Sequence, residues 1–246
     1  MSDRNNLLYQ DKDFLVIEKA AGVITLNCPG SKGKRTLQNW LEKYIFPEKS
    51  FKVINDDFSE RSGIVHRLDK DTSGLILVAK NKESFKSLQD QFKERKVKKT
   101  YRALVVGDIP LSGTIFVPIK RMARSRNKFC VSPGGKKAKT SYKVINRFML
   151  GKTIYSYLEV YPFTGRTHQI RVHLNYLGYP IVGDILYGYK TNLSVSRMFL
   201  HALAIDFYHP VNNNQIGFRS QLPKNILDVI NKLSNKPSSE KKAEKT

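Results

Sequence analysis

The chain has 246 residues, of which 40% are apolar, enough for one large domain or two closely packed subdomains. Its longest apolar runs are too short to cross a membrane, and residues 1–6 carry no apolar signal region, so we expect a cytoplasmic protein without a membrane partner. The two cysteines, Cys28 and Cys130, lack metal-binding spacing and argue against both a disulfide framework and a zinc cluster.

The net charge of +22 points to a polyanionic partner, with nucleic acid as the leading candidate. The alternative is a general lysine bias unrelated to any ligand. The excess is uneven, because residues 109–158 contain eleven Lys and Arg and no acidic residue.

The first expected elements are a hairpin and a helix. Residues 7–19 predict two short strands with a turn at Asp11 to Asp13. Thr36 can cap a helix that ends before Pro47. Trp40 lies on its apolar side, so we expect it in the core.

A polar loop follows in the sequence Gly63-Ile-Val-His-Arg-Leu-Asp-Lys-Asp-Thr-Ser-Gly74. It places His66, Arg67 and Asp69 directly before an apolar strand expected at 75–79, which would anchor the loop at the rim of a sheet. A solvated salt-bridge cluster is an equally good interpretation of this pattern alone.

The next segments predict a helix and a strand. Phe85, Leu88 and Phe92 recur at helical spacing, and residues 100–107 are typical of a strand. Tyr101 at the start of that strand is a second candidate site residue. Its alternative is an edge-strand tyrosine that packs on a neighbour.

The acid-free segment predicts a mobile basic hairpin that turns at Pro133-Gly134-Gly135 and closes on phosphates. A solvated charged loop is the alternative. The candidate RNA-binding cations are Lys120, Arg121, Arg124, Arg126, Lys136 and Lys137.

After a strand at 153–161, residues 164–171 are expected to begin a helix with Ile170, Leu174 and Leu177 inward. Gly178 is placed to end it. His168 and His173 are five residues apart, which does not suit a zinc pair, so no metal site is predicted.

The carboxyl-terminal part predicts a strand at 198–208, a return strand at 216–219 and a terminal helix indicated by Leu227, Ile230 and Leu233. Residues 235–246 have no apolar face and are expected to be a disordered tail behind a catalytic domain at 1–234.

Three segments in this order resemble the RluA-type RNA pseudouridine synthases: Gly63 to Gly74, Lys99-Thr-Tyr-Arg-Ala103, and Thr164-Gly-Arg-Thr-His-Gln-Ile-Arg-Val-His173. Gly178 to Asp184 and Leu200-His-Ala202 extend the resemblance to about residues 7–223. One departure is Lys19-Ala20-Ala21-Gly22, where the family has a proline after the lysine; we expect a looser turn there.

The resemblance implies an α+β fold: a long, bent, mainly antiparallel mixed sheet flanked by helices, with two subdomains around a basic cleft. It also implies conversion of uridine in ribosomal or transfer RNA to pseudouridine without a cofactor. We expect a monomer, with no separate RNA-binding domain ahead of residue 7.

The same resemblance assigns roles to individual residues. Asp69 would be the nucleophile or the base that removes a ribose proton, and Arg166 would pair with it and lower its pKa. Tyr101 would stack on uracil and help to take the C5 proton. The remaining roles are displacement of the base by Arg67, packing beneath it by Leu200, and shaping of the loop through hydrogen bonds of His66 and Thr72.

Two other functions are compatible with parts of the sequence. A noncatalytic RNA-binding or ribosome-assembly factor would keep the basic surface, but the intact Asp69, Tyr101 and Arg166 disfavour it. A nucleoside glycosidase would call for a pair of cooperating carboxylates, for which Asp71 is a poor partner to Asp69.

Overall fold

The computed structural model describes residues 5–47, 56–123, 125, 127–188 and 191–235. The chain divides into two compact units: unit 1 comprises Met1–Tyr101 and Leu200–Ser220, and unit 2 comprises Arg102–Phe199 and Gln221–Thr246. Within the described ranges, no helix is both long and apolar enough to cross a membrane. The expected tail at 235–246 falls almost wholly outside these ranges.

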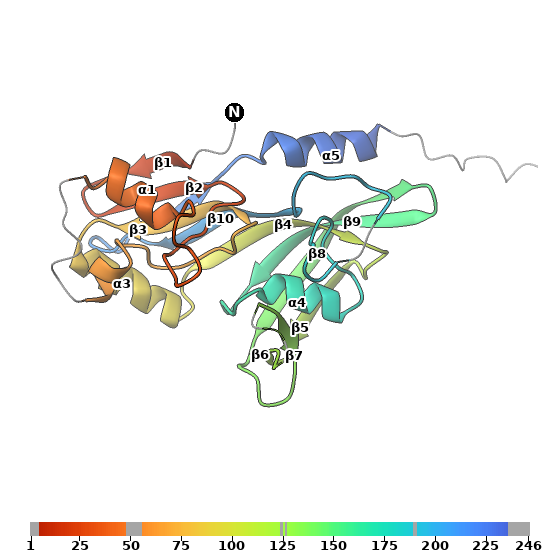
Figure 1. Cartoon of the computed structure of the whole chain (residues 1–246), viewed down its shortest axis with the longest axis horizontal. Helices are drawn as coiled ribbons and strands as arrows, with labels where there is room; N and C mark the ends of the chain where they lie inside the picture. Colours follow the sequence, from red (N-terminus) through yellow and green to blue (C-terminus); the bar gives the residue numbers. More distant parts are fainter. Residues whose placement is uncertain (1–4, 48–55, 124, 126, 189–190, 236–246) are drawn as a thin grey trace, which may run out of the picture. The chain divides into compact units, whose positions relative to one another are not determined.

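Unit 1 is built on strands in the order β1-β2-β3-β10, with β11 added to β10 (Figure 1). All neighbouring pairs are antiparallel except β3 with β10, which runs parallel. The predicted hairpin at the start of the chain is confirmed. The strands are β1 (Asn6–Gln10), β2 (Phe14–Lys19), β3 (Ser73–Ala79), β10 (Leu200–Tyr208) and β11 (Gln215–Arg219).

Three helices belong to unit 1: α1 (Leu37–Tyr44), α2 (Asp57–Glu60) and α3 (Lys82–Lys93). Thr36 caps α1 as predicted, because its side chain accepts a hydrogen bond from the Asn39 N–H. Helix α3 packs on β3, whose residues are all buried. The prediction for Trp40 is wrong: its side chain is only partly buried and lines a surface pocket.

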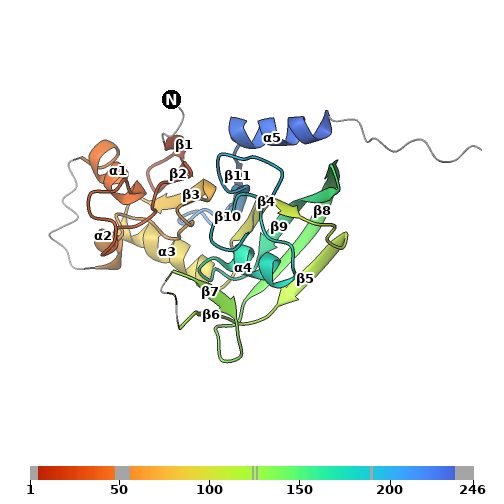
Figure 2. The same cartoon turned by 45° about the vertical axis from the view of Figure 1, so that its right-hand side comes forward.

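Unit 2 contains strands in the order β4-β9-β8-β5, and β8 and β9 form its longest antiparallel pair (Figure 2). Strand β4 (Lys98–Val106) begins in unit 1 and continues into unit 2 at Arg102. The other elements are β5 (Ser112–Phe116), β6 (Ile119–Arg121), β7 (Phe129–Val131), β8 (Lys139–Leu150), β9 (Thr153–Pro162), α4 (Gln169–Tyr176) and α5 (Lys224–Ser234).

The basic segment differs from the single hairpin that we expected. Strands β6 and β7 pair with each other, and the loop between them, not Pro133-Gly134-Gly135, is the end of that hairpin. The turn at 132–135 instead brings Lys136 back against Ile119. This small sheet packs on α4 through Ile119, Val172 and Ala138.

The buried residues of α4 differ at one position from those predicted, and α5 confirms the predicted terminal helix. Helix α4 buries Ile170 and Leu174, but Leu177 lies beyond its end and is exposed, because Gly178 with φ of 86° turns the chain away. Helix α5 buries Ile226 and Leu233, and Leu227 is exposed. The fold as a whole is α+β with a mixed, mainly antiparallel sheet, as expected.

Candidate active site

The loop that carries Asp69 lies between an isolated bridge at Ile64 and the first residue of β3. The loop is anchored by β3, in which every residue is buried. Gly74 is required there: a Cβ at this position would lie 2.2 Å from the carbonyl oxygen of Ala202 on β10, and its φ is 117°. The parallel contact of β3 with β10 therefore fixes where the loop ends.

His66 shapes the loop through a hydrogen bond, as predicted. Its Nε2 accepts the N–H of Leu77 at 3.0 Å, which places the ring proton on Nδ1. The imidazole packs against Phe92 at 4.6 Å between ring centroids. Burial lowers the pKa of His66 to about 3, with Lys99 and Arg61 adding to the effect, so the ring is neutral at physiological pH.

Thr72 shapes the loop through a hydrogen bond of its backbone and not of its hydroxyl. Its hydroxyl is buried and has no hydrogen-bond partner among the described residues. The backbone of Thr72 holds the loop, because the Thr72 N–H donates to the Asp69 carbonyl at 3.2 Å and closes a turn.

A second segment of unit 1 holds the same loop from the other side. The hydroxyl of Thr25 donates to the Leu68 carbonyl at 2.7 Å and accepts the Leu68 N–H at 3.2 Å. The Gly22 N–H and the Lys19 ammonium both donate to the Lys70 carbonyl, at 2.9 and 3.0 Å. The residues on both sides of Asp69 are therefore fixed to the chain at 19–25.

Lys19 makes hydrogen bonds that hold the turn at 20–22. The buried Lys19 ammonium donates to the carbonyls of Ala20 and Val23, both at 2.8 Å. Sequence reasoning missed Lys19 and Thr25 as site residues. The available signal was a lysine at the end of an otherwise apolar strand, where burial needs polar partners.

Asp69 and Tyr101 belong to the same unit and interact electrostatically. Asp69 is partly buried in the loop, and Tyr101 is buried on β4. Burial raises the pKa of Tyr101 strongly, and the charge of Asp69 raises it further. A phenol of this kind stays protonated at physiological pH, and the expected roles of Tyr101 in stacking and in taking the C5 proton stay predictions.

Two further predicted residues lie in unit 1. Arg67 is exposed on the Asp69 loop, and Leu200 is buried as the first residue of β10. Next to Leu200, His201 is fully buried between Ser73 and Ser220, whose hydroxyls lie 2.7 and 2.6 Å from its ring nitrogens. The start of β10 is thereby tied to the start of β3.

Arg166 lies in unit 2, in the turn before α4 and not on the helix itself. Its side chain is exposed, and its Nε donates to the Lys137 carbonyl at 3.1 Å. The predicted pair of Arg166 with Asp69 joins residues of different units and stays a prediction.

Gln169 organises the turn around Arg166, and sequence reasoning missed it. Its Oε1 accepts the Arg166 N–H at 3.0 Å and the Thr164 hydroxyl at 2.6 Å. Its Nε2 donates to the carbonyl of Lys139 and the hydroxyl of Thr140 on β8. The one signal was a glutamine at the start of an amphipathic helix.

A buried ion pair supports the same region. Arg171 on α4 donates through Nε and an Nη to the carboxylate of Asp184 at 2.7 and 2.9 Å. The Asp184 carboxylate also accepts the N–H groups of Leu186 and Tyr187. Tyr187 in turn lies 2.9 Å from Nδ1 of His168, so the Gly165 to His173 segment is held by a continuous polar network.

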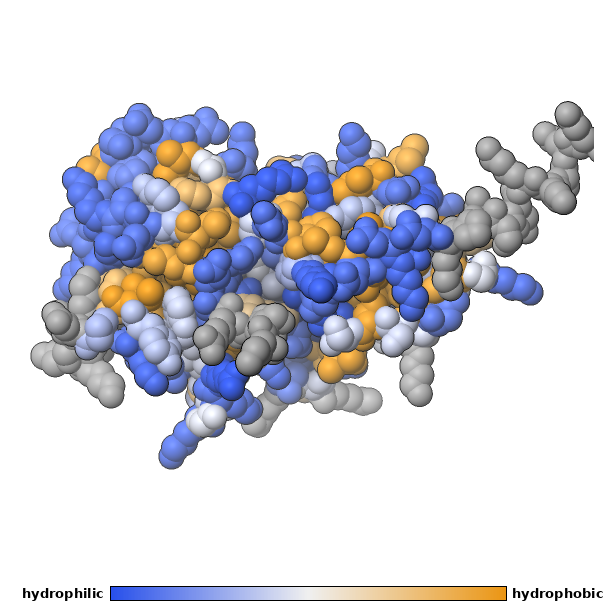
Figure 3. Space-filling view, turned by 90° about the horizontal axis from the view of Figure 1, so that it is seen from above, coloured by the Kyte–Doolittle hydropathy of each residue, from blue (hydrophilic) through white to orange (hydrophobic). Residues whose placement is uncertain are grey.

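Four of the predicted RNA-binding cations lie on the surface of unit 2. Lys120, Arg121, Lys136 and Lys137 are all exposed around the β6–β7 sheet, and the Arg121 guanidinium lies 5.0 Å from the Phe129 ring. Arg124 and Arg126 fall outside the described residues. Polar side chains also cover much of the face seen in Figure 3, with apolar patches between them.

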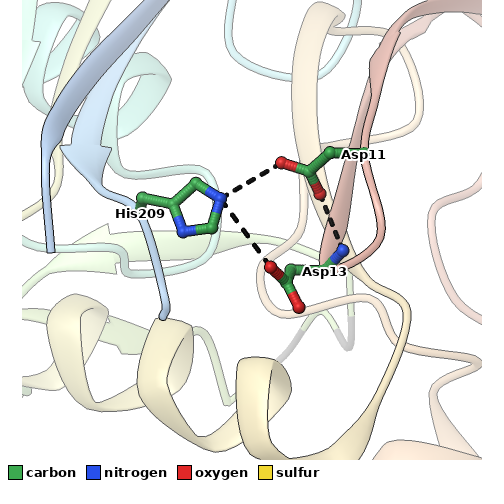
Figure 4. Close-up of side chains that lie close together, drawn as sticks. All are labelled: Asp11, Asp13 and His209. Carbon is green, nitrogen blue, oxygen red and sulfur yellow. Dashed lines mark hydrogen bonds and ion pairs between the residues drawn. The ribbon is translucent and has the colours of Figure 1, made fainter. Parts of the chain in front are cut away.

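Among the described residues, Asp11, Asp13 and His209 of unit 1 bring potential metal-ligand atoms within 4.8 Å of one another (Figure 4). Asp11 accepts the N–H groups of Asp13 and Phe14 at 2.7 and 2.8 Å, and its other oxygen lies 3.2 Å from Nε2 of His209. Nδ1 of His209 accepts backbone N–H groups, so Nε2 carries the proton. We assign the cluster to anchoring the β1–β2 turn.

The comparisons with known proteins agree with these motifs. The family model described as RNA pseudouridylate synthase matches residues 13–176, which include Asp69, Tyr101 and Arg166. An uncharacterized RNA pseudouridine synthase of Chloroflexus aurantiacus is 41% identical over 89% of this chain and 66% of its own length. The ribosomal large subunit pseudouridine synthase D of Pseudomonas aeruginosa is 36% identical over 92% of this chain and 71% of its own.

A solved structure gives the same result for the fold. Human RNA Pseudouridylate Synthase Domain Containing 1 superposes with a TM-score of 0.69 at 28% identity and covers 96% of both chains. The chain spans about two thirds of the length of the curated relatives named above. The chain belongs to the RNA pseudouridylate synthase family, whose members isomerise uridine in RNA to pseudouridine.

Proposed function

We propose that this chain isomerises one or more uridines of large-subunit ribosomal RNA. The observation that carries the proposal is the Asp69 loop, which is fixed on both sides of the carboxylate and lies close enough to Tyr101 for its charge to act on the phenol. The ribosomal target is favoured over transfer RNA because the similar protein of Pseudomonas aeruginosa is a ribosomal large subunit pseudouridine synthase D.

The reaction breaks the N1–C1′ bond, turns the uracil, and joins C5 to C1′. The hydrogen at C5 leaves and N1 gains one, so atoms and electrons balance without a cofactor. Asp69 acts either as the nucleophile or as the base that removes a ribose proton. Tyr101 supplies an aromatic surface for the uracil while it is detached, and Leu200 an apolar one.

The uridine must leave its stack before Asp69 can reach it. Arg67 is exposed on the same loop and two residues before the aspartate, so it can enter the vacated space in the RNA. The cations around β6 and β7 hold the backbone through phosphates. Arg166 acts together with Asp69 in this proposal, as the resemblance to the family implies.

A noncatalytic assembly factor would need the same basic surface but would not need the hydrogen bonds around Asp69. Holding a loop at both sides of one carboxylate is typical of a reacting group that must be preorganised. We also propose that the protein acts as a cytoplasmic monomer. Gel filtration tests the oligomeric state, and a monomer is expected to elute at an apparent mass near 28.2 kDa.

The function is tested by release of tritium from RNA labelled at uracil C5, because forming the C5–C1′ bond must expel that hydrogen. Transcripts of large-subunit ribosomal RNA and of transfer RNAs are assayed in parallel. We expect release from the ribosomal transcript. Release from transfer RNA alone would overturn the ribosomal assignment, and release from neither would overturn the activity.

A further inference from the structure

Unit 1 has an open surface pocket of about 730 Å³ away from the Asp69 loop. Trp40 and Tyr44 from α1 form its aromatic part, with ring centroids 6.1 Å apart. Trp40 is partly buried, and 59% of Tyr44 is exposed. The full lining is Asn5, Val23, Arg35, Thr36, Asn39, Trp40, Lys43 and Tyr44.

The charge of the pocket is positive, because Arg35 and Lys43 line it and no acidic residue does. Neither cation forms an ion pair with another residue in the described parts of the chain. The Lys43 ammonium lies 5.0 Å from the centroid of the Tyr44 ring. Exposed aromatic rings beside unpaired cations are the combination that binds single-stranded nucleic acid.

Two asparagines at the rim can recognise the edge of a base. Asn39 uses its Oδ1 to accept a bond from Asn27, and Asn5 uses its Oδ1 to accept the Ala20 N–H. Each amide nitrogen has no partner among the described residues and remains a donor.

The pocket is connected to the catalytic loop by one short segment of chain. Ile24 forms a bridge with Thr36 on the pocket side, and the Leu37 N–H donates to the Ile24 carbonyl at 2.7 Å. On the other side, Thr25 makes two hydrogen bonds to Leu68, directly before Asp69. A ligand in the pocket therefore contacts the segment that holds the aspartate.

We propose that this pocket is a second RNA-binding site, which takes an unpaired base of the substrate strand flanking the target uridine. The base stacks on Trp40 and Tyr44, and Arg35 and Lys43 contact its phosphates. The volume is in the range of pockets that hold one small organic ligand. The inference rests on the proposed function for the identity of the RNA, but the site can be tested by binding alone.

Trp40 is the sole tryptophan of the chain, so its fluorescence reports on this pocket directly. The wild-type protein is titrated with a single-stranded oligoribonucleotide and with an RNA duplex of the same length. Stacking predicts saturable quenching by the single strand and little by the duplex. Unchanged fluorescence at saturating single strand would overturn the proposal.

Matched variants test the affinity. Tyr44→Ala is expected to weaken binding of the single strand about tenfold. Lys86→Gln is the control, because it removes an exposed lysine of α3 outside the pocket. Its affinity for the single strand should stay within about twofold of the wild type, since only one nonspecific charge is lost. Equal affinities of the two variants would exclude the pocket. Tighter binding of adenosine monophosphate than of the oligonucleotide would reassign it to a free nucleotide.

Turnover separates this inference from the proposed function. Tyr44→Ala should raise KM for ribosomal RNA about tenfold and change kcat by less than about twofold, because stacking of a flanking base contributes to binding in ground and transition states alike. Quenching of Trp40 without any tritium release would leave the pocket intact and reject the isomerase. Normal tritium release with an unchanged KM in Tyr44→Ala would support the isomerase and reject the pocket as an RNA-binding site.

Discussion

The hydroxyl of Thr25 makes two hydrogen bonds to the backbone of Leu68, one to its carbonyl at 2.7 Å and one from its N–H at 3.2 Å. All of these groups are buried, and the next residue is Asp69. The backbone next to the Asp69 carboxylate is thus held by a side chain 44 residues away from Asp69 in the sequence.

Thr25→Val tests this dependence. It removes both bonds and leaves two buried backbone groups unpaired, at a cost of about 1–3 kcal/mol in the free energy of unfolding. We expect kcat to fall about 10- to 100-fold from misplacement of Asp69, with a smaller change in RNA affinity. Thr25→Ser keeps the hydroxyl and is the control. A Val variant with wild-type kcat would show that the contact does not position Asp69.

Thr72→Val makes the same change as Thr25→Val, but at a hydroxyl that has no hydrogen-bond partner among the described residues. Because the Thr72 hydroxyl is buried and unpaired among the described residues, replacing it with a methyl group should leave stability unchanged or raise it by about 1 kcal/mol. Chemical denaturation of the two Val variants side by side measures the contrast. A loss as large as that of Thr25→Val would mean that the hydroxyl has a role in holding the loop.

His66 predicts a specific dependence of stability on pH. Its pKa is about 3 in the folded protein, below the ordinary value of 6.5, so between these values the unfolded chain binds more protons. Stability must therefore fall as the pH falls from 6.5 towards 3. After allowance for partial exposure, the contribution of this one group is about 2–4 kcal/mol.

His66→Gln retains an acceptor for the Leu77 N–H but does not titrate. Unfolding free energies of the wild type and the variant are measured from pH 7 to 4. The contributions of the other titrating groups cancel in the difference between the two proteins at each pH. We expect the gap between the two proteins to shift in favour of the variant as the pH falls. A gap that stays constant with pH would contradict the assigned protonation of His66.

The cations of the β6–β7 region predict the salt dependence of RNA binding. Lys136 and Lys137 are exposed, and each phosphate contact should contribute roughly 0.7–0.9 to the slope of log affinity against log salt concentration. The double variant Lys136→Gln and Lys137→Gln should therefore have a shallower slope, smaller in magnitude by about 1.5. An unchanged slope would place the phosphates elsewhere.

The sequence predicted the elements with a strong local signal. Thr36 as a helix cap, the β1–β2 hairpin and the helix of Phe85 and Leu88 follow from spacing within a few residues. The exposure of Trp40 could not be predicted, because it depends on which segments cover α1. The inward position predicted for Leu177 was also wrong, because α4 ends at Tyr176 and Leu177 lies beyond it.

The candidate site was predicted only in part, because contacts between distant segments cannot be predicted from local sequence patterns. The motif residues His66, Asp69 and Tyr101 were found, but the residues that hold them were not. Thr25, Lys19 and Gln169 act through contacts between segments far apart in the chain, and no periodicity marks such contacts. The hydroxyl of Thr72 shows the converse, because it has no partner among the described residues although it belongs to the motif.

The central claim is that Asp69 performs the chemistry, and Asp69→Asn tests it most directly. The amide has the shape of the carboxylate but can neither attack the sugar nor remove a proton. Tritium release from C5-labelled ribosomal RNA and affinity for the same RNA are measured for both proteins. We predict that the variant binds RNA with wild-type affinity and releases no tritium, and release at the wild-type rate would contradict the account.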